Sequence, residues 1–370
     1  MKMKTAGQKG LLRQLQGLPA ILLSILLAFC ISGIFISLAG KSPIDAFSIM
    51  ITGALGSASG LSQVLIKSTP ILLIGLGVCI GLRGGLTNLG GDGQLIMGAM
   101  AAIMIGVTLD GVLAAPLVRI LAFIGGALAG GIWGGLVGLL KAKFHMNVII
   151  TTIMLNYITN YLLGYAVQGP LKAEGSYLPQ TQTLPQEFRL PGILPGVRAH
   201  MGVVYALILA VGVYLFLRRT DWGYQIRVLG QAPRAAEYAG VRPRRYTIFI
   251  MFLAGAFAGA AGMIEMYGVY YRGISGIGDG VGFTAVSAAL LAGSHPLLLI
   301  PASLFFGMLS AGANVMQVNV GIPNSVVNIT QGTIILFALI SPVIGRVLSQ
   351  LFRRVRNGAA VHGRRADDTV

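Results

Sequence analysis

Apolar segments of helix-spanning length recur from one end of this chain to the other, and they constrain the fold more than any other feature. They lie near 18–39, 62–82, 93–109, 114–140, 147–168, 201–217, 246–268, 281–293, 297–316 and 326–348. About 20 apolar residues match one helical crossing of a bilayer, and a single soluble core could not bury so many. The sequence therefore predicts an all-α polytopic membrane protein with about ten transmembrane helices. The segments at 93–109 and 281–293 are short and interrupted by glycine, which is typical of broken or re-entrant helices.

Composition supports this prediction and excludes several soluble classes. Only 10% of the 370 residues are charged, against roughly 25% in an ordinary soluble domain. The net charge of +16 comes from basic residues at the ends of apolar segments, which argues against a folded nucleic-acid-binding surface. Most of the lysines and arginines fall on the side of the membrane that holds the N-terminus, so both termini are predicted to be cytoplasmic.

The predicted organisation is one membrane domain between two tails. Residues 1–17 form a cytoplasmic tail, residues 18–350 the transmembrane domain, and residues 351–370 a basic cytoplasmic tail. A proline-rich outer loop covers 169–200, and a basic inner loop covers 218–245.

The inner loop contains a compact helical signal. Pro233 suits a first helical turn, the residues after it are mostly good helix formers, and Gly240 suits the stop. A short helix between two membrane segments is either a docking surface or a solvated connector.

One helix carries a glycine stripe. Glycines at 126, 130, 134 and 138 recur at every fourth residue of the 114–140 segment. This spacing places them on one face and allows another helix to approach closely. We expect packing within the subunit, with contact to another subunit as the alternative.

Signals of soluble enzymes are absent from the sequence. The four histidines show no metal-ligand spacing, and Gly40-Lys41-Ser42 lacks the earlier glycine of a phosphate-binding loop because Phe35 stands there. The chain is therefore predicted to be no enzyme, with no bound metal or cofactor of its own.

Polar side chains inside the apolar segments are the candidate solute-binding residues. Such groups are costly in a membrane and usually face a cavity or a partner. The candidates for a hydrophilic pathway are Asn88, Asp92, Gln94, Thr152, Asn156, Tyr157, Asn160 and Asn328. Amides and tyrosines suit a neutral solute with hydroxyls or ring nitrogens. The alternative is that these groups tie helices together.

Three stretches resemble a known family, the bacterial ABC-importer permeases for branched-chain amino acids, simple sugars and nucleosides. They are residues 88–94 (NLGGDGQ), 147–157 (NVIITTIMLNY) and 230–241 (GQAPRAAEYAGV). The first two are most similar to the nucleoside branch that works with basic-membrane-protein-type lipoproteins. Asp92 stands where the family usually has glutamate, and Val148 where it tends to have glutamate.

The resemblance implies a type II ABC-importer permease fold in the bacterial inner membrane, with helices 2–5 and 7–10 related as two repeats. It also implies three protein partners: an ABC ATPase subunit that uses the ATP, a second homologous permease, and an extracytoplasmic solute-binding lipoprotein. The inner loop would seat on the ATPase through Pro233, Arg234, Ala235, Ala236, Glu237, Tyr238 and Gly240.

The predicted function is the permease subunit of an importer for nucleosides or a related simple sugar. Branched-chain amino acids are an alternative solute class. A secondary transporter driven by an ion gradient is another alternative, with Asp92 and Glu265 as its candidate carboxylates. A membrane scaffold or receptor without transport is the third.

Overall fold

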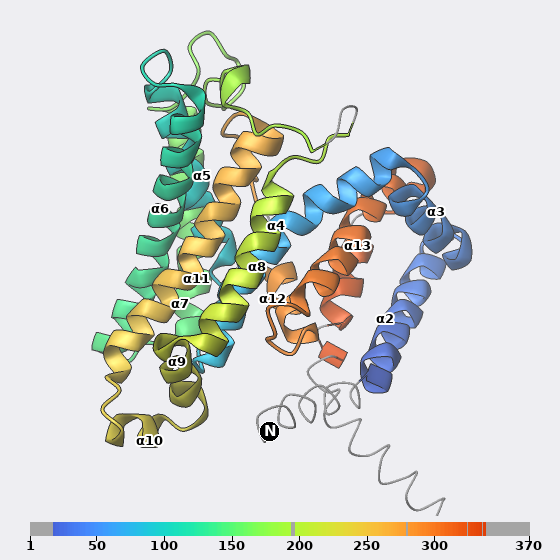
Figure 1. Cartoon of the computed structure of the whole chain (residues 1–370). Helices are drawn as coiled ribbons and strands as arrows, with labels where there is room; N and C mark the ends of the chain where they lie inside the picture. Colours follow the sequence, from blue (N-terminus) through green and yellow to red (C-terminus); the bar gives the residue numbers. More distant parts are fainter. Residues whose placement is uncertain (1–17, 194–196, 279, 324, 335, 338–370) are drawn as a thin grey trace, which may run out of the picture. The chain divides into compact units, whose positions relative to one another are not determined.

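The computed structural model describes residues 18–193, 197–278, 280–323, 325–334 and 336–337 (Figure 1). Both predicted tails, 1–17 and 351–370, lie outside these residues. The chain divides into two compact units, one of residues 47–321 and one of residues 1–46 with 322–370.

The larger unit is a helical bundle. Its regular elements are α4 (Ala58–Arg83), α5 (Gly91–Thr108), α6 (Ala115–Phe144), α7 (Val148–Gln168), η1 (Gln186–Phe188), α8 (Gly202–Arg219), α9 (Asp221–Gln231), α10 (Pro233–Tyr238), α11 (Pro243–Glu265), η2 (Met266–Tyr270), α12 (Val281–Leu291) and α13 (Leu299–Val320). Helix α11 packs along α6 and α5, and α4 packs against α11, α12 and α13 (Figure 1). Helices α9 and α10 lie at one end of the bundle, and the 169–201 connection lies at the other (Figure 1).

The smaller unit contains α2 (Leu18–Leu38) and the helical residues 325–334. The buried hydroxyls of Ser32 and Thr330 are hydrogen-bonded at 2.5 Å and connect these two helices. Helix α3 (Pro43–Leu55) begins in this unit and continues into the larger one.

Among the residues that the structure describes, seven helices are long and apolar enough to cross a membrane, and an eighth crossing results if α2 and α3 count as one bent span. Helix α12 has 11 residues and extends only about 16 Å, roughly half of a bilayer core. This confirms the prediction that 281–293 is a short segment, whereas α5 is continuous over 18 residues. The last predicted segment, 326–348, extends beyond the described residues. The polytopic all-α class is confirmed, and the count of ten crossings stays a prediction.

The glycine stripe of α6 packs within the chain, as predicted. A Cβ built on Gly130 would lie 2.4 Å from the carbonyl oxygen of Gly255, and one on Gly134 would lie 2.3 Å from that of Met251. In return, a Cβ on Gly255 would lie 2.1 Å from the carbonyl oxygen of Gly130. Because real Cβ atoms do not approach backbone this closely, only glycine permits the observed contact of α6 with α11.

Two helices were missed by sequence reasoning, α3 and α9. Both had local start signals. Pro43 opens α3 with Asp45 in its first turn, and the Thr220 hydroxyl caps α9 by accepting from the Gly223 N–H at 3.1 Å. These signals were overlooked because neither segment has the length of a membrane crossing.

Candidate functional site

The chain reverses between α4 and α5, and two buried amides hold the start of α5. The Asn88 side chain donates to Oε1 of Gln94 at 2.9 Å, and its Oδ1 accepts from the Gly90 N–H at 2.9 Å. Gly90 is the N-cap residue of α5 and has no side chain to cap the helix. Asn88 and Gln94 therefore organise a helix start that the cap residue cannot organise itself.

Asn156 of α7 completes the same helix start from a distance in sequence. Its Oδ1 accepts from the Gly93 N–H at 2.9 Å, and its Nδ2 donates to the Leu89 carbonyl at 2.9 Å. A Cβ on Gly93 would lie 2.7 Å from the Asn156 oxygen, so the glycine permits the bond. The amide thus pairs a first-turn N–H that would otherwise be unsatisfied and ties α7 to α5.

Asp92 joins α5 to α12 at their N-terminal ends. Its Oδ1 accepts from the backbone N–H of Gly282, in the first turn of α12, at 2.5 Å. The approach is close: a Cβ on Gly91 would lie 3.0 Å from the Gly282 Cα, and one on Gly282 would lie 2.6 Å from the Asp92 nitrogen. A buried carboxylate between two helix N-termini balances the positive ends of both macrodipoles.

These contacts bring together five of the eight predicted pathway residues. We call this cluster the α5 junction: Asn88, Asp92, Gln94, Thr152 and Asn156. All five are at most 8% exposed. The Thr152 hydroxyl donates back to the Val148 carbonyl at 2.8 Å. The hydrogen bonds of these residues connect α5, α7 and α12. Connecting helices is the alternative role that the sequence analysis gave for these polar groups, and their contact with a solute stays a prediction.

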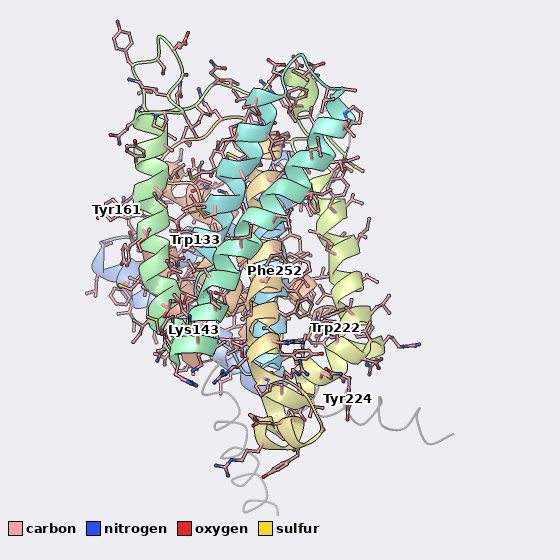
Figure 2. The ribbon with its side chains drawn as sticks, turned by 90° about the vertical axis from the view of Figure 1, so that its left-hand side faces the viewer. Trp133, Lys143, Tyr161, Trp222, Tyr224 and Phe252 are labelled. Atoms are coloured by element: carbon pink, nitrogen blue, oxygen red, sulfur yellow. The ribbon has the colours of Figure 1, made fainter. Side chains whose placement is uncertain are left out.

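Two other predicted residues lie on the outer face of α7. Tyr157 and Asn160 are exposed, and Asn160 Nδ2 donates to the Asn156 carbonyl at 3.2 Å. Tyr161 and Tyr165 continue the same face with 78% and 71% exposure. Figure 2 shows Tyr161 pointing away from the neighbouring helices. Asn328, the eighth residue, is exposed in the smaller unit.

Two ionisable residues, Glu265 and Lys67, stand inside long apolar segments of the chain. Glu265, at the end of α11, is 8% exposed, and the Lys67 ammonium on α4 acts on it electrostatically. Each residue is a lone charge in an apolar run, which was the available signal, because such charges in membranes usually have a partner. Only the fold places the two near each other.

The predicted short helix of the inner loop is present as α10. Pro233 is its first residue, and Gly240 follows its end at φ +84°. The Val241 N–H donates to the Ala236 carbonyl and the Gly240 N–H to the Glu237 carbonyl, both at 3.0 Å, which is the Schellman pattern of a helix stop.

The residues of α10 differ strongly in exposure. Ala236 is fully buried, whereas Tyr238 is 94% exposed. Pro233, Arg234, Ala235, Glu237 and Gly240 are exposed as well. Helix α10 therefore presents nearly all of its predicted docking residues to the outside and anchors itself through one alanine.

Helix α9 rests directly on the turn after α4. A Cβ on Gly230 would lie 2.1 Å from the Arg83 carbonyl oxygen and 2.9 Å from the Gly84 carbonyl carbon. Gly85, at φ +76°, faces the Gly230 Cα. The same turn leads within a few residues to Asn88, so one chain segment connects α9 to the α5 junction.

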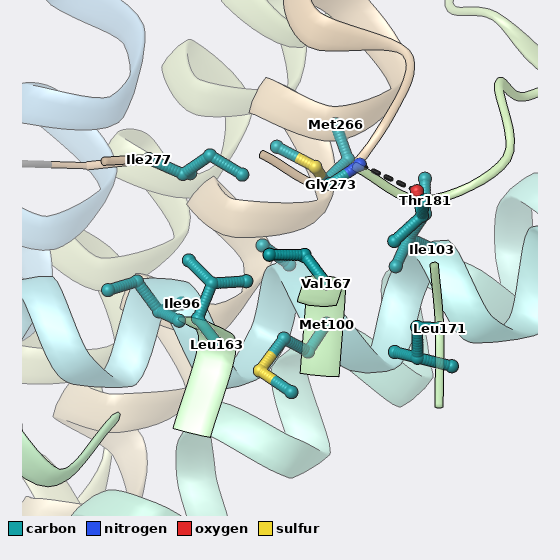
Figure 3. A pocket seen from close by; sticks show the side chains of 11 residues that line it. Ile96, Met100, Ile103, Leu163, Val167, Leu171, Thr181, Met266, Gly273 and Ile277 are labelled. Carbon is teal, nitrogen blue, oxygen red and sulfur yellow. Dashed lines mark hydrogen bonds between the residues drawn. The ribbon is translucent and has the colours of Figure 1, made fainter. Parts of the chain in front are cut away.

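At the opposite end of the bundle, the 169–201 connection is held against η2 and the residues after it. The Leu190 N–H donates to the Tyr267 carbonyl at 2.8 Å, and the Leu184 N–H donates to that of Tyr271 at 2.7 Å. The Thr181 hydroxyl accepts from the Gly273 N–H at 2.8 Å (Figure 3). Figure 3 shows apolar side chains closing around a small cavity below this bond. The part of the connection from Leu171 to Leu190 is therefore tied down over α5, α7 and η2.

His200 lies at the end of this connection and is 2% exposed. Its Nδ1 accepts from the Gly202 N–H at 3.2 Å, and its Nε2 is buried without a hydrogen-bond partner among the described residues. Burial lowers the pKa of His200 from 6.5 to about 4. The ring is therefore neutral at pH 7.

The amino-acid sequence matches one family profile over residues 60–339, and that family is described as "Branched-chain amino acid transport system / permease component". Individual relatives match over nearly the whole chain. The glucose ABC transporter permease protein TsgB13 of Haloferax volcanii is 32% identical over 94% of this chain and 91% of its own length. The guanosine ABC transporter permease protein NupP of Bacillus subtilis is 32% identical over 94% of this chain and 100% of its own. The nucleoside ABC transporter permease protein NupB of Lactococcus lactis is 29% identical over 87% of this chain and 91% of its own.

Proposed function

Because the chain belongs to the family of branched-chain amino acid transport system permeases, we propose that it is the membrane-spanning subunit of an ATP-driven importer for nucleosides or a related simple sugar. A separate ATPase subunit hydrolyses the ATP, a second homologous permease completes the pathway, and an extracytoplasmic lipoprotein delivers the solute. The end of the bundle with α9 and α10 is cytoplasmic in this proposal, and the 169–201 connection faces outside.

The contact of α9 with the α4–α5 turn is the observation that carries the proposal. Helix α10 would dock on the ATPase through its exposed residues, and any movement of α10 would reach α9 through the single residue between them, Ala232. Gly230 of α9 touches Arg83 and Gly84 without space for a side chain. The movement would therefore be passed to the α5 junction, which joins three helices of the bundle. Coupling requires that the nucleotide states bind the two conformations with different affinity.

The exposed face of α7 is the proposed wall of the solute pathway. Tyr157, Tyr161 and Tyr165 repeat at every fourth residue and are 60–78% exposed. Hydroxyls facing only lipid would lack hydrogen-bond partners, so a polar pathway shared with the second permease suits this face better. In this proposal Tyr157 and Asn160 contact the solute, and the α5 junction sets whether the pathway is open.

The substrate class rests on the relatives and on this face. Two of the relatives described above are named for guanosine or nucleosides and one for glucose. Aromatic rings suit stacking with a nucleobase, and the amide of Asn160 suits its ring nitrogens or the sugar hydroxyls. Nucleosides offer both features, whereas a simple sugar offers only the hydroxyls.

Branched-chain amino acids are a second candidate because the matching family profile carries the description of a branched-chain amino acid transport permease. The competition experiment below includes leucine for this reason.

The outer connection is the proposed docking surface for the binding protein. Tyr177 is fully exposed and Leu178 is 64% exposed. An exposed aromatic residue beside an exposed leucine on an otherwise tethered loop suits recognition by a partner protein.

The proposal is tested by uptake of radiolabelled guanosine, glucose and leucine in cells that lack only this chain, with unlabelled competitors and plasmid rescue. Loss of guanosine uptake that the intact chain restores is expected. Loss of glucose or leucine uptake alone would keep the permease role and refute the nucleoside class. Unchanged uptake of all three would leave no support for the proposed substrates. An uncoupler applied at constant ATP should not abolish the rescued uptake; if it does, the ion-gradient alternative is favoured.

The docking role of α10 is tested with Ala235→Asp. Ala235 is exposed whereas Ala236 is fully buried, so a change at 235 alters the surface without disturbing the fold. We expect the variant to insert normally, fail to assemble with the ATPase and lose uptake. Wild-type uptake by the inserted variant would contradict this role.

A further inference from the structure

A cavity of about 230 Å³ lies beside α10, between the first turns of α9 and α11. Three aromatic side chains form one wall: Trp222 from α9, and Tyr246 and Phe249 from α11. Arg242 and Arg245 contribute to its rim, and both are exposed. Gly240, which follows the docking helix, also lines the cavity, whereas the three aromatic residues and the two arginines belong neither to the solute pathway nor to the docking residues.

The aromatic wall is compact and mostly apolar. The ring centroids of Trp222 and Phe249 are 4.8 Å apart, and those of Trp222 and Tyr246 are 5.7 Å apart. The Tyr246 hydroxyl donates to the Gln225 side chain, so its polar end is already engaged. The cavity therefore offers ring faces to an occupant rather than free hydroxyls.

The rim is basic. Neither Arg242 nor Arg245 has an ion-pair partner within the part of the chain that the structure describes. The nearby carboxylate of Asp221 acts electrostatically on Tyr246. The whole 218–245 segment contains seven arginines and two acidic residues. An occupant with a negative charge at the rim is therefore favoured.

The position of the cavity identifies the kind of occupant. Helix α11 is a membrane-spanning helix that begins at Pro243, so Phe249 lies about 9 Å deeper than Pro243 along its axis. The headgroup layer on each side of a bilayer core is about 5–8 Å thick. With the start of α11 placed at the bilayer surface, the arginines lie at headgroup depth and the rings reach the start of the hydrocarbon. Figure 2 shows Trp222, Tyr224 and Lys143 toward the same end of the bundle, which is typical of a membrane interface.

We propose that this cavity binds one anionic phospholipid, with its phosphate on Arg242 and Arg245 and the first part of its acyl chains on the aromatic wall. An amphiphile matches both halves of the cavity, whereas a soluble phosphate would leave the rings exposed and an acidic protein side chain would not reach them. Such a lipid would hold the start of α9 at the membrane surface, while Gly230 near the other end of the same helix contacts the α4–α5 turn. The proposal does not depend on which solute is transported.

The two tryptophans of the chain make the cavity directly observable. Trp133 Nε1 is buried without a hydrogen-bond partner among the described residues, so Trp133→Phe removes no hydrogen bond and leaves Trp222 as the only tryptophan. Full-length protein with this change is placed in nanodiscs that contain brominated phosphatidylglycerol or brominated phosphatidylcholine. Bromine quenches tryptophan fluorescence only at short range, so quenching reports the lipid beside Trp222.

We expect half-maximal quenching at a several-fold lower mole fraction of phosphatidylglycerol than of phosphatidylcholine. The double variant Arg242→Gln/Arg245→Gln should lose this preference. Arg244→Gln is the matched control, because Arg244 is exposed in the same helical turn but does not line the cavity. Equal quenching by the two lipids, or a preference that survives in the double variant, would overturn the proposal.

The same variants are compared in the complex assembled with its ATPase, by mass spectrometry of co-purified lipids. Phosphatidylglycerol should be retained by the wild-type and Arg244→Gln complexes and lost from the double variant. Retention by all three complexes, or by none, would contradict a lipid site and point to a protein surface or solvent at this cavity.

Discussion

Gly230→Ala is the sharpest test of how α9 transmits movement to the bundle. The added Cβ would lie 2.1 Å from the Arg83 carbonyl oxygen, whereas ordinary contact begins at 3.4 Å. The neighbouring atom is backbone and cannot rotate away, so α9 and the α4–α5 turn must separate by about 1.3 Å. Overpacking of this kind costs about 1–3 kcal/mol. Part of this cost is offset by the better helix propensity of alanine, about 1 kcal/mol.

The expected consequence is uncoupling rather than unfolding. The close contact lies at the junction of two segments, and the buried core of α4, α5, α6 and α11 is left unchanged. We expect solute uptake to fall about tenfold, which corresponds to about 1.4 kcal/mol of lost coupling, while assembly with the ATPase and ATP hydrolysis persist.

The assay compares uptake with ATP hydrolysis in membrane vesicles that contain the variant and its native partners. Gly212→Ala is the control, because a Cβ on Gly212 of α8 would have nothing within 4 Å, and its uptake should equal that of the wild type. A Gly230→Ala protein with wild-type uptake per ATP hydrolysed would refute transmission through this contact. Joint loss of assembly and hydrolysis would also refute it, because the contact would then be needed only for folding.

Three further predictions concern stability and are measured by thermal unfolding of the detergent-solubilised full-length chain. Gly130→Ala should lower the melting temperature, because the new methyl would lie 2.4 Å from the Gly255 carbonyl oxygen, at a cost of about 1–3 kcal/mol; a melting temperature like that of Gly212→Ala would show that α6 and α11 separate freely. Asp92→Asn should destabilise the chain by about 1–2 kcal/mol, because a neutral amide interacts less with the two helix N-termini; an unchanged melting temperature would show that the charge contributes nothing. His200 has a folded pKa of about 4 against 6.5 for the free group, so protonation favours unfolding, and stability should fall as the pH drops from 6.5 toward 4. Between pH 7 and pH 5 the loss is about 2 kcal/mol, and His200→Gln should lack this component; the same pH dependence in both proteins would contradict a buried neutral ring.

Local features of the sequence predicted the membrane class and most helix positions. A helical crossing needs a long apolar run and shields its own backbone, so each crossing can be recognised without knowledge of its neighbours. The short helix after Pro233 and its stop at Gly240 were recognised for the same reason, since both signals act within a few residues. The glycine stripe of α6 predicted close packing because its spacing alone places the glycines on one face.

The candidate site depended on the fold to a much greater extent. Asn88, Asp92, Gln94 and Asn156 were recognised as unusual polar residues in apolar surroundings, but their spacing could not say whether they meet a solute or one another. The hydrogen bonds of Asp92 to Gly282 and of Asn156 to Gly93 join residues 190 and 63 positions apart.

Pairings over such distances are decided by which helices come together. The same holds for Lys67 with Glu265 and for Gly230 with the α4–α5 turn, where a lone charge and a lone glycine carry no sign of their partners. The sequence by itself determined that the chain crosses a membrane and where most of its helices run. Only the tertiary structure decided which polar groups satisfy one another and which remain exposed on α7 and α10, because hydrogen bonding and burial between distant segments arise from packing and not from local sequence.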